Sequence, residues 1–200
     1  MLITSVQNPS VKNIVKLAKS RERKAQRLFV IEGARELLLA LQSDYVVESV
    51  YVCWEMFVKT KYPGVLDGIE KKNIFDVSPE VFCKIAYREN SDGVVAIAKP
   101  RSHILGDLKL SVNPFVIVLE AVEKPGNLGA ILRTADAAAV DAVVVCDPQT
   151  DLYNPNVVRS SVGGIFTVQT AVCSSGDAAE WLKNNNITPY AAELQAAEFY

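Results

Sequence analysis

The sequence predicts an α/β protein built from two α/β units, and three observations lead to this fold class. Short apolar runs with the length of strands alternate along the chain with segments whose apolar residues recur at helical spacing. The run at 115–118 is continuously apolar, which is typical of a parallel strand covered on both faces. A polar segment, 99–113, separates the two sets of elements and indicates a boundary near residue 103.

The first unit is expected to span residues 1–103. We expect its strands at 28–31, 46–54, 74–77 and 94–98, and a helix in the leucine-rich segment after Gly33. Ser78 and Pro79 indicate the start of another helix, because serine is a favourable cap and proline fits the first turn. Strands that alternate with helices in this way predict a layered α/β unit.

The second unit, 104–200, shows the alternation more clearly. Its strands are expected at 115–119, 142–146, 165–168 and about 188–191, and its helices at 128–139, 156–161 and 177–184. Consecutive strands lie far enough apart for crossover connections, which predicts a parallel sheet. Asn154 and Pro155 open the middle helix, and Gly163 and Gly164 close it.

The turn at 125–129, between the first strand and the first helix of the second unit, is a candidate ligand site. Amide groups at a helix N-terminus bind anions, and ligands of open α/β sheets lie at the carboxyl ends of the strands. We expect Asn127 to cap the helix and Arg133 to project from its flank toward the turn. The alternative for Arg133 is a surface ion pair with Asp136, one helical turn further along.

A nucleotide site of the dehydrogenase type is a further interpretation of this turn. The turn lacks the Gly-x-Gly-x-x-Gly pattern and also the Gly-Lys-Ser/Thr pattern of a phosphate loop. Asp147, however, lies about 20 residues beyond the turn, where a dinucleotide-binding fold places its ribose-binding acid. A Rossmann-like nucleotide-binding protein therefore stays open as an alternative.

Charge is distributed unevenly along the chain. The net charge is only −2, yet seven basic residues within the first 27 positions are opposed by Glu22 alone. These residues are Lys12, Lys16, Lys19, Arg21, Arg23, Lys24 and Arg27. A basic arm on an acidic protein favours a polyanion partner such as RNA, which the arm would contact at its phosphates. The alternative is an ordinary amphipathic helix with a solvated basic face.

The cysteines and the single histidine give no sign of a metal site. Cys53, Cys83, Cys146 and Cys173 share no metal or redox spacing, so we interpret them as buried thiols in a reducing compartment. His103 lies in the polar segment with no ligand partner nearby and is interpreted as a linker residue. Because the chain shows neither an apolar stretch of about 20 residues nor a signal core, we expect a cytoplasmic protein without a membrane partner.

Three segments resemble one known family. Residues 127–135, NLGAILRTA, and 154–168, NPNVVRSSVGGIFTV, closely resemble the first motif and part of the second motif of the SpoU (TrmH) RNA ribose 2′-O-methyltransferases. The N-terminal pattern at 8–36, NPSVKNIVKLAKSRERKAQRLFVIEGARE, is similar to the small substrate-binding domain that many members carry. The resemblance therefore covers nearly the whole chain.

This resemblance implies an S-adenosylmethionine-dependent enzyme that methylates a ribose 2′-hydroxyl in RNA, with rRNA preferred over tRNA as the substrate. It implies an RNA-binding first domain, 1–103, and a SPOUT-type methyltransferase domain, 104–200, with a parallel sheet, a trefoil knot and usually a homodimer. No metal is required. Arg133 matches the catalytic arginine of the family, Asn127 matches the motif asparagine, and Arg159 matches a basic residue expected near the RNA.

The role of Arg133 is open between two chemical possibilities. The family proposal makes this arginine the base that removes the ribose proton, but a guanidinium with a pKa above about 12 is a poor base. The second possibility is that Arg133 clamps a phosphate and stabilises negative charge that develops on the ribose oxygen.

Tyr87 also has two possible roles. Its ring could stack on an RNA base, although packing within the protein is the expected role.

The chain also departs from the family pattern. Lys124 stands where aspartate is usual, and Ala139 stands where glycine is common, which we expect to be a small packing change. The sequence stops at Tyr200 without the third motif, so we expect a C-terminally incomplete methyltransferase domain. The remaining family cofactor contacts match Ala192, Glu193 and Leu194. A catalytically inactive RNA-binding module is therefore the alternative from another functional class.

Overall fold

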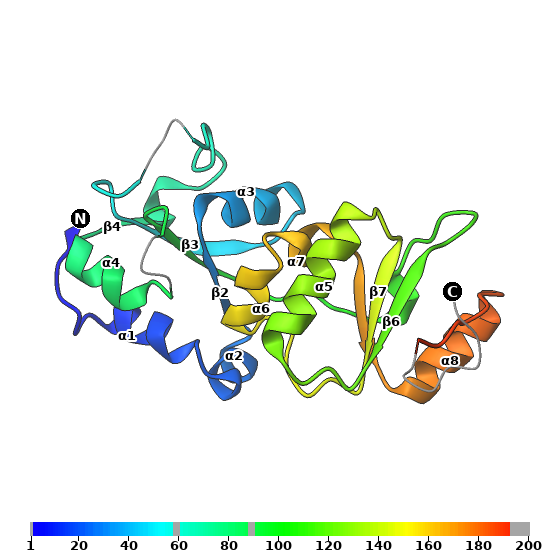
Figure 1. Ribbon diagram of the computed structural model, residues 1–200. Coiled ribbons are helices and arrows are strands. Elements are labelled where there is room, and N and C mark those ends of the chain that lie inside the picture. The colour runs from blue at the N-terminus through cyan, green and yellow to red at the C-terminus, as the bar shows by residue number, and fades with distance from the viewer. Residues whose placement is uncertain (1, 58–60, 88–90, 193–200) are drawn as a thin grey trace.

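The computed structural model describes residues 2–57, 61–87 and 91–192. It is an elongated α/β molecule that contains two sheets (Figure 1). A five-stranded sheet takes its strands from residues 2–98, and a three-stranded parallel sheet takes its strands from residues 116–173. This arrangement confirms the α/β fold class. Helices long and apolar enough to cross a membrane are absent from these described ranges.

The first sheet mixes parallel and antiparallel pairs. Its strands are β1 (Leu2–Ile3), β2 (Phe29–Glu32), β3 (Val47–Val52), β4 (Ile74–Val77) and β5 (Val94–Ala98), in the order β1-β4-β3-β5-β2. Strand β4 is parallel to β1 and β3, whereas β5 is antiparallel to β3 and β2. The four expected strands are confirmed. Strand β1 was not expected, because two residues are too few to show a pattern.

Helices cover both faces of the first sheet. Helix α3 (Ala34–Gln42) covers one face, and α1 (Pro9–Lys16) and α4 (Pro79–Ile85) cover the other. Helix α2 (Ser20–Gln26) follows α1, a short 3-10 turn at Lys71–Asn73 precedes β4, and another at Leu105–Asp107 packs against the second sheet. Alternate residues of β5 face opposite sides, so Val94 and Ala96 join the core with α3, while Val95 and Ile97 join the core with α1 and α4. Ser78 caps α4 as predicted, and its hydroxyl accepts the Val81 N–H at 3.3 Å.

The second sheet is parallel, as the sequence predicts. It consists of β6 (Val116–Glu120), β7 (Ala142–Cys146) and β8 (Thr170–Cys173), with β7 in the centre. Its helices are α5 (Pro125–Ala137), α6 (Pro155–Ser160), α7 (Gly164–Thr167) and α8 (Ser175–Asn184). In Figure 1, α8 lies at the end of the molecule opposite to β1. The trefoil knot that the resemblance implies stays a prediction.

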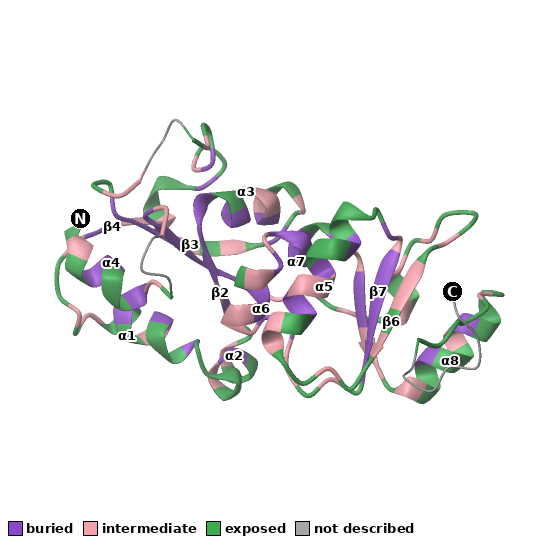
Figure 2. Ribbon diagram, in the orientation of Figure 1, coloured by how far each residue is buried: buried purple, intermediate pink, exposed green. Residues whose placement is uncertain are grey.

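The prediction that the 115–118 run is covered on both faces is wrong. Strand β6 is an edge strand with β7 as its described neighbour, and its residues are partly exposed, whereas β7 is wholly buried (Figure 2). Phe115, just before β6, is 57% exposed. An unbroken apolar run identifies a strand, but its burial depends on its position in the sheet, which the run itself does not encode.

Two further strands were wrongly predicted. Residues 165–168 lie mainly in α7, and the strand follows at β8 instead. Short apolar runs are ambiguous between a strand and a buried helix, and here Gly164 lets α7 lie directly against Leu132 of α5. The 188–191 segment has no regular secondary structure in the described part of the chain.

One hydrophobic core joins the two sheets. Phe29 of β2 packs on Tyr153, with ring centroids 4.2 Å apart, and Phe166 of α7 lies against Tyr45 at 5.1 Å. These aromatic side chains belong to a core cluster that also contains residues of α3, α5 and β7. The two units are therefore held together by buried apolar surface. The predicted domain boundary between residues 103 and 104 stays a prediction.

His103 closes a buried polar network at this junction and is more than the predicted linker residue. Its Nδ1 lies 2.9 Å from the Thr170 carbonyl oxygen, and its Nε2 lies 2.7 Å from the Tyr153 hydroxyl. Because a carbonyl only accepts, Nδ1 carries the hydrogen and Nε2 accepts from Tyr153. The Tyr45 hydroxyl, 3.3 Å away, then donates to the oxygen of Tyr153. Burial lowers the pKa of His103, although the hydrogen bond to Thr170 partly opposes this shift, and burial raises the pKa of Tyr153.

We expect the imidazole of His103 to titrate below 6.5 in the folded protein, because burial disfavours the charged form. A lowered pKa gives stability that is complete above about pH 6.5 and is lost as the pH falls from there through the folded pKa. Since the chain has one histidine, the Hε1 resonance in a ¹H NMR titration is assigned without ambiguity and reports this pKa directly. The His103→Gln variant should lack the resonance, and a folded pKa at or above 6.5 would contradict the network.

Candidate functional site

Helix α5 begins earlier than the sequence predicts. Lys124 is the N-cap residue and Pro125 is the first helical residue, with no side-chain cap. Asn127 lies in the first turn, where its N–H donates to the Lys124 carbonyl at 3.0 Å, and its side chain is exposed. The prediction that Asn127 caps the helix is therefore wrong, because proline at the first position already favours the earlier start. Its catalytic role stays a prediction.

Helices α5 and α6 approach each other closely at Gly129. A Cβ atom at this position would lie 2.7 Å from the Val157 carbonyl oxygen and would also overlap the Ser160 hydroxyl. Because glycine has no side chain, nothing separates the two helix backbones at this buried position. This contact brings Arg133 of α5 and Arg159 of α6 to the same side of the helix pair.

Replacing Gly129 with alanine should lower the free energy of unfolding by about 1–3 kcal/mol, the usual cost of overpacking a close contact. Gly126→Ala is the matched control, because its Cβ would meet only the Asn156 side chain at an ordinary 3.6 Å. Denaturant unfolding compares the two variants. Equal unfolding midpoints would show that the close approach at Gly129 is not required.

Arg133 and Arg159 line one cavity of about 450 Å³, which we call the arginine cavity. Its walls are Glu36 of α3, Ala130 and Arg133 of α5, and Asn156, Arg159, Ser160 and Val162 of α6 and the turn after it. Asn127 does not line this cavity. The arginine cavity therefore combines groups from both units and brings two sequence-predicted arginines together.

The alternative that Arg133 forms a surface pair with Asp136 is wrong. The carboxylate of Asp136 accepts a hydrogen bond of 2.6 Å from the Thr167 hydroxyl instead. Arg133 is exposed, and no ion pair joins it to another residue in the described ranges. Its guanidinium is therefore available to an anionic ligand.

The turn that follows Arg159 is strained. Val162 has a φ of +50° in the left-handed region, where a β-branched residue is an outlier, and Gly163 follows with a φ of +96°. Strained backbone of this kind is concentrated at functional sites. Ala139, two residues after the end of α5, also has a φ of +50°, a backbone conformation that favours glycine. The predicted small packing change at Ala139 stays a prediction.

Tyr87 lies at the surface beside Arg159. The Arg159 guanidinium is 5.9 Å from the centroid of the Tyr87 ring, and the residue is 56% exposed. The expectation that Tyr87 packs inside the protein is therefore wrong. Arg159 is exposed in the last turn of α6, where a cation is also favourable for the helix dipole.

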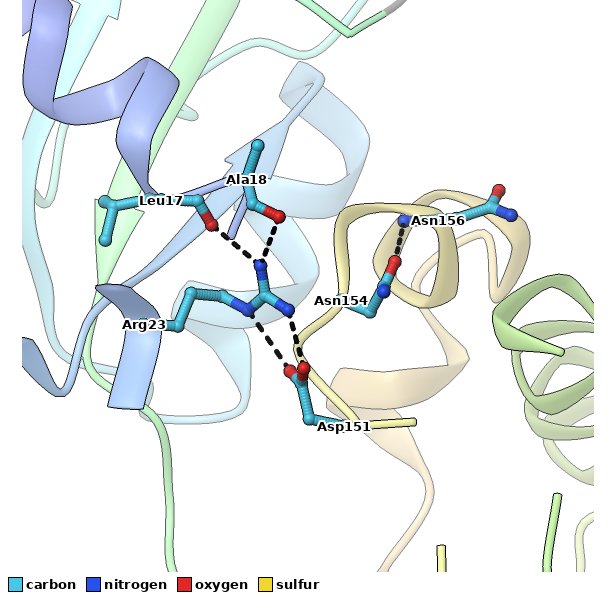
Figure 3. A network of polar contacts seen from close by, with 6 residues as sticks. All are labelled: Leu17, Ala18, Arg23, Asp151, Asn154 and Asn156. Atoms are coloured by element: carbon cyan, nitrogen blue, oxygen red, sulfur yellow. Dashed lines mark hydrogen bonds and ion pairs between the residues drawn. The ribbon is translucent and has the colours of Figure 1, made fainter. Parts of the chain in front are cut away.

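The basic arm is exposed except at Arg23. Six side chains face solvent: Lys12, Lys16, Lys19, Arg21, Lys24 and Arg27. Arg23 is only 5% exposed, and its Nη1 donates to the Leu17 and Ala18 carbonyls at 2.8 Å each (Figure 3). Its Nε and Nη2 donate to the two oxygens of Asp151 at 3.2 Å and 2.6 Å. The prediction that Arg23 contacts RNA is therefore wrong.

The predicted cofactor contacts and thiols have mixed outcomes. Ala192 is exposed, while Glu193 and Leu194 lie outside the described residues.

Among the cysteines, Cys53 and Cys146 are buried as expected, but Cys83 is exposed. Strand pairing places Cys146 in register with Cys173, and burial raises the pKa of the Cys146 thiol to about 12. Neighbouring strands thus bring together thiols that are far apart in sequence.

Comparison with family models and curated proteins gives consistent matches. The SpoU rRNA Methylase family matches residues 114–200, and the MRM3-like substrate binding domain matches residues 8–96. The chain is 31% identical over 194 residues to the 23S rRNA (guanosine(2553)-2'-O)-methyltransferase RlmP of Bacillus subtilis (strain 168), covering 96% of this chain and 73% of that protein. Two further curated relatives are matched over only 58% and 54% of their own length.

Solved structures agree with these matches. A crystal structure of an RNA 2'-O ribose methyltransferase aligns with a TM-score of 0.81 at 36% identity, covering 96% of this chain and 74% of that one. The AdoMet-bound rRNA methyltransferase from Sinorhizobium meliloti aligns with a TM-score of 0.79 at 27% identity, covering 92% and 68%. The sequence matches, the domain matches and the shared fold lead to one conclusion: the chain belongs to the SpoU rRNA methylase family.

Proposed function

We propose that this protein transfers a methyl group from S-adenosylmethionine to a ribose 2′-hydroxyl of rRNA. The observation that carries the proposal is the convergence of Arg133 and Arg159 in one cavity of a SpoU-family chain. The names of the relatives support the reaction and the substrate class, since RlmP is a 23S rRNA 2'-O-methyltransferase. Cytoplasmic location and a homodimer stay predictions.

Arg133 acts as a phosphate clamp in this proposal. Its exposed guanidinium can donate two parallel hydrogen bonds to a phosphate of the bound RNA, and Arg159 adds a second positive charge in the same cavity. The fixed phosphate aligns the neighbouring ribose, and the positive potential stabilises negative charge that develops on its 2′-oxygen. A guanidinium keeps its proton in proteins, so a role as general base is disfavoured.

When it is bound, S-adenosylmethionine supplies a methyl group that is electrophilic because it is attached to a positively charged sulfonium sulfur. The predicted cofactor contacts are Ala192, Glu193 and Leu194, and of these only Ala192 lies within the described residues. Ala192 is exposed, so its backbone is accessible to a ligand. The cofactor assignment therefore rests on family membership and on the AdoMet-bound relative. The chain's own contribution is to hold the RNA and to orient the ribose.

The first unit, residues 1–103, selects the RNA, and the second unit, 104–200, carries the reaction. The six exposed cations of the arm suit contact with phosphates, because no acidic side chain other than Glu22 lies among them. A calorimetric titration with S-adenosylmethionine and an anisotropy titration with rRNA test whether one chain binds both ligands. RNA binding without cofactor binding would support the alternative, an RNA-binding module without catalysis.

Neutralising Lys16, Lys19 and Lys24 together should weaken RNA binding and flatten its dependence on salt. Each phosphate contact that is lost should reduce the slope of log affinity against log salt by about 0.7 to 0.9. Glutamine at these exposed positions removes the charge and keeps a polar side chain that is one atom shorter. The control variant replaces Lys71, Lys72 and Lys183, which lie outside the arm, and an unchanged slope in the arm variant would remove the arm from the RNA contact.

A further inference from the structure

A second cavity, of about 130 Å³, adjoins the arginine cavity, and Arg159 lines both. Helices α1, α4 and α6 meet around it, and the strand residue Val30 contributes to its wall. Its lining is mostly apolar and includes Val15, Ala18, Ile85 and Val158. Val15 is 41% exposed, so this apolar surface reaches solvent.

Three groups give the rim of this second cavity a particular chemistry. The Tyr87 ring and the Arg159 guanidinium lie 5.9 Å apart, and both side chains are exposed. The exposed Lys84 adds a second cation. Tyr87 is held by its backbone, because its N–H donates to a carboxylate oxygen of the buried Glu32 at 2.5 Å. An aromatic face, two cations and the buried carboxylate of Glu32 thus line an otherwise apolar hollow.

This combination fits a small flat aromatic group. The second cavity, at about 130 Å³, is slightly smaller than the apolar cavity of about 150 Å³ that holds benzene, and it is open to solvent, so it has the size for one small ring and is too small for a whole nucleotide. Bases stack on tyrosine rings and on guanidinium planes, and apolar walls exclude water from the stacked faces. Charge also favours nucleic acid, since exposed Lys12 and Lys16 lie on α1 close by.

We propose that the second cavity binds one unstacked nucleobase of the RNA strand whose phosphate lies at Arg133 and Arg159. The proposal rests on the function proposed above and adds a subsite to it. Arg159 connects the two cavities, so a phosphate in one and a base in the other belong to nearby nucleotides. Base stacking at Tyr87 then fixes the strand in register, while the apolar lining tolerates more than one base.

The test uses a twelve-nucleotide oligouridine, labelled with fluorescein for affinity or carrying 5-iodouridine for photocrosslinking. We expect the crosslink on Tyr87 and at least a roughly fivefold loss of affinity in Tyr87→Leu, the lower limit for one lost base stack. Ala18→Phe, which fills the second cavity without changing charge, should weaken binding similarly. Tyr87→Phe keeps the ring and should retain affinity.

The matched control is Tyr190→Leu, the same replacement at a fully exposed tyrosine, which should bind like the original chain. If the original chain binds the oligonucleotide but Tyr87→Leu and Ala18→Phe bind equally well, the base subsite is wrong and the proposed function stands. A crosslink only on other residues also overturns the subsite. If the original chain binds 23S rRNA but not the oligonucleotide, the base subsite is also wrong; if it binds neither RNA, the proposed function itself fails.

Discussion

Replacing Arg133 with alanine is expected to slow methyl transfer by about 10²–10³-fold, the usual effect of removing a charge-stabilising donor. RNA affinity should fall only severalfold, because Arg159 and the six exposed cations of the arm remain. Single-turnover rates at saturating RNA separate the two effects. Arg133→Lys should recover part of the rate, since lysine keeps the charge but cannot form the bidentate contact.

Thr134→Ala is the control for this experiment. Thr134 is the exposed neighbour of Arg133 on α5, its hydroxyl donates to the Ala130 carbonyl at 3.1 Å, and it does not line the arginine cavity. Its loss should leave the rate within about twofold, as is usual for surface substitutions. An unchanged rate in Arg133→Ala would remove this residue from the mechanism.

Replacing Arg23 with methionine is expected to lower the free energy of unfolding by about 3 kcal/mol. The guanidinium satisfies the Leu17 and Ala18 carbonyls and both oxygens of Asp151, and breaking a buried pair by removing one partner costs about 3–5 kcal/mol. We expect the lower end, because Asp151 is 26% exposed and can be partly hydrated. Denaturant unfolding measures the loss.

The control is Lys24→Met, a substitution at the next residue, whose side chain is exposed and which should change stability by less than about 0.5 kcal/mol. Asp151→Asn in the Arg23→Met background should restore part of the stability, because it removes the unpaired charge. Equal stability of Arg23→Met and Lys24→Met would show that the contact in Figure 3 contributes nothing.

Loss of Arg23 should also disturb the arginine cavity. Asp151 begins the loop in which Asn154 caps α6 by accepting the Asn156 N–H at 2.9 Å, and Asn156 lines the cavity (Figure 3). The arm and helix α6 are therefore connected through one guanidinium. A lower rate of methyl transfer in Arg23→Met, under conditions where the variant remains folded, follows from this connection.

Local signals in the sequence predicted most elements correctly. Ser78 with Pro79, and Asn154 with Pro155, mark helix starts by the hydrogen bonds of their side chains, which need no distant partner. Strands with strong apolar patterns, such as β5 and β7, have the predicted bounds. The 165–168 segment failed because its apolar residues suit either a strand or a buried helix, and only packing against α5 selects the helix.

Residues whose roles depend on distant partners could not be assigned from the sequence. Arg23 looks like the other cations of the arm until Asp151, 128 positions away, is seen to bind it. His103 similarly looks unpartnered until Tyr153 and Thr170 surround it. The family motifs identified Arg133 and Arg159 separately, but their shared cavity depends on the close approach of α5 and α6 at Gly129.

Methylation of the ribose by this chain is tested by locating the methyl group that the chain transfers. Unmodified 23S rRNA is incubated with the chain and isotopically labelled S-adenosylmethionine, then digested to nucleosides and analysed by mass spectrometry. We expect label on the ribose 2′-oxygen with the original chain and about a hundredfold or more less label with Arg133→Ala. Label on a base, or equal ribose label with both chains, would show that the proposed function is wrong.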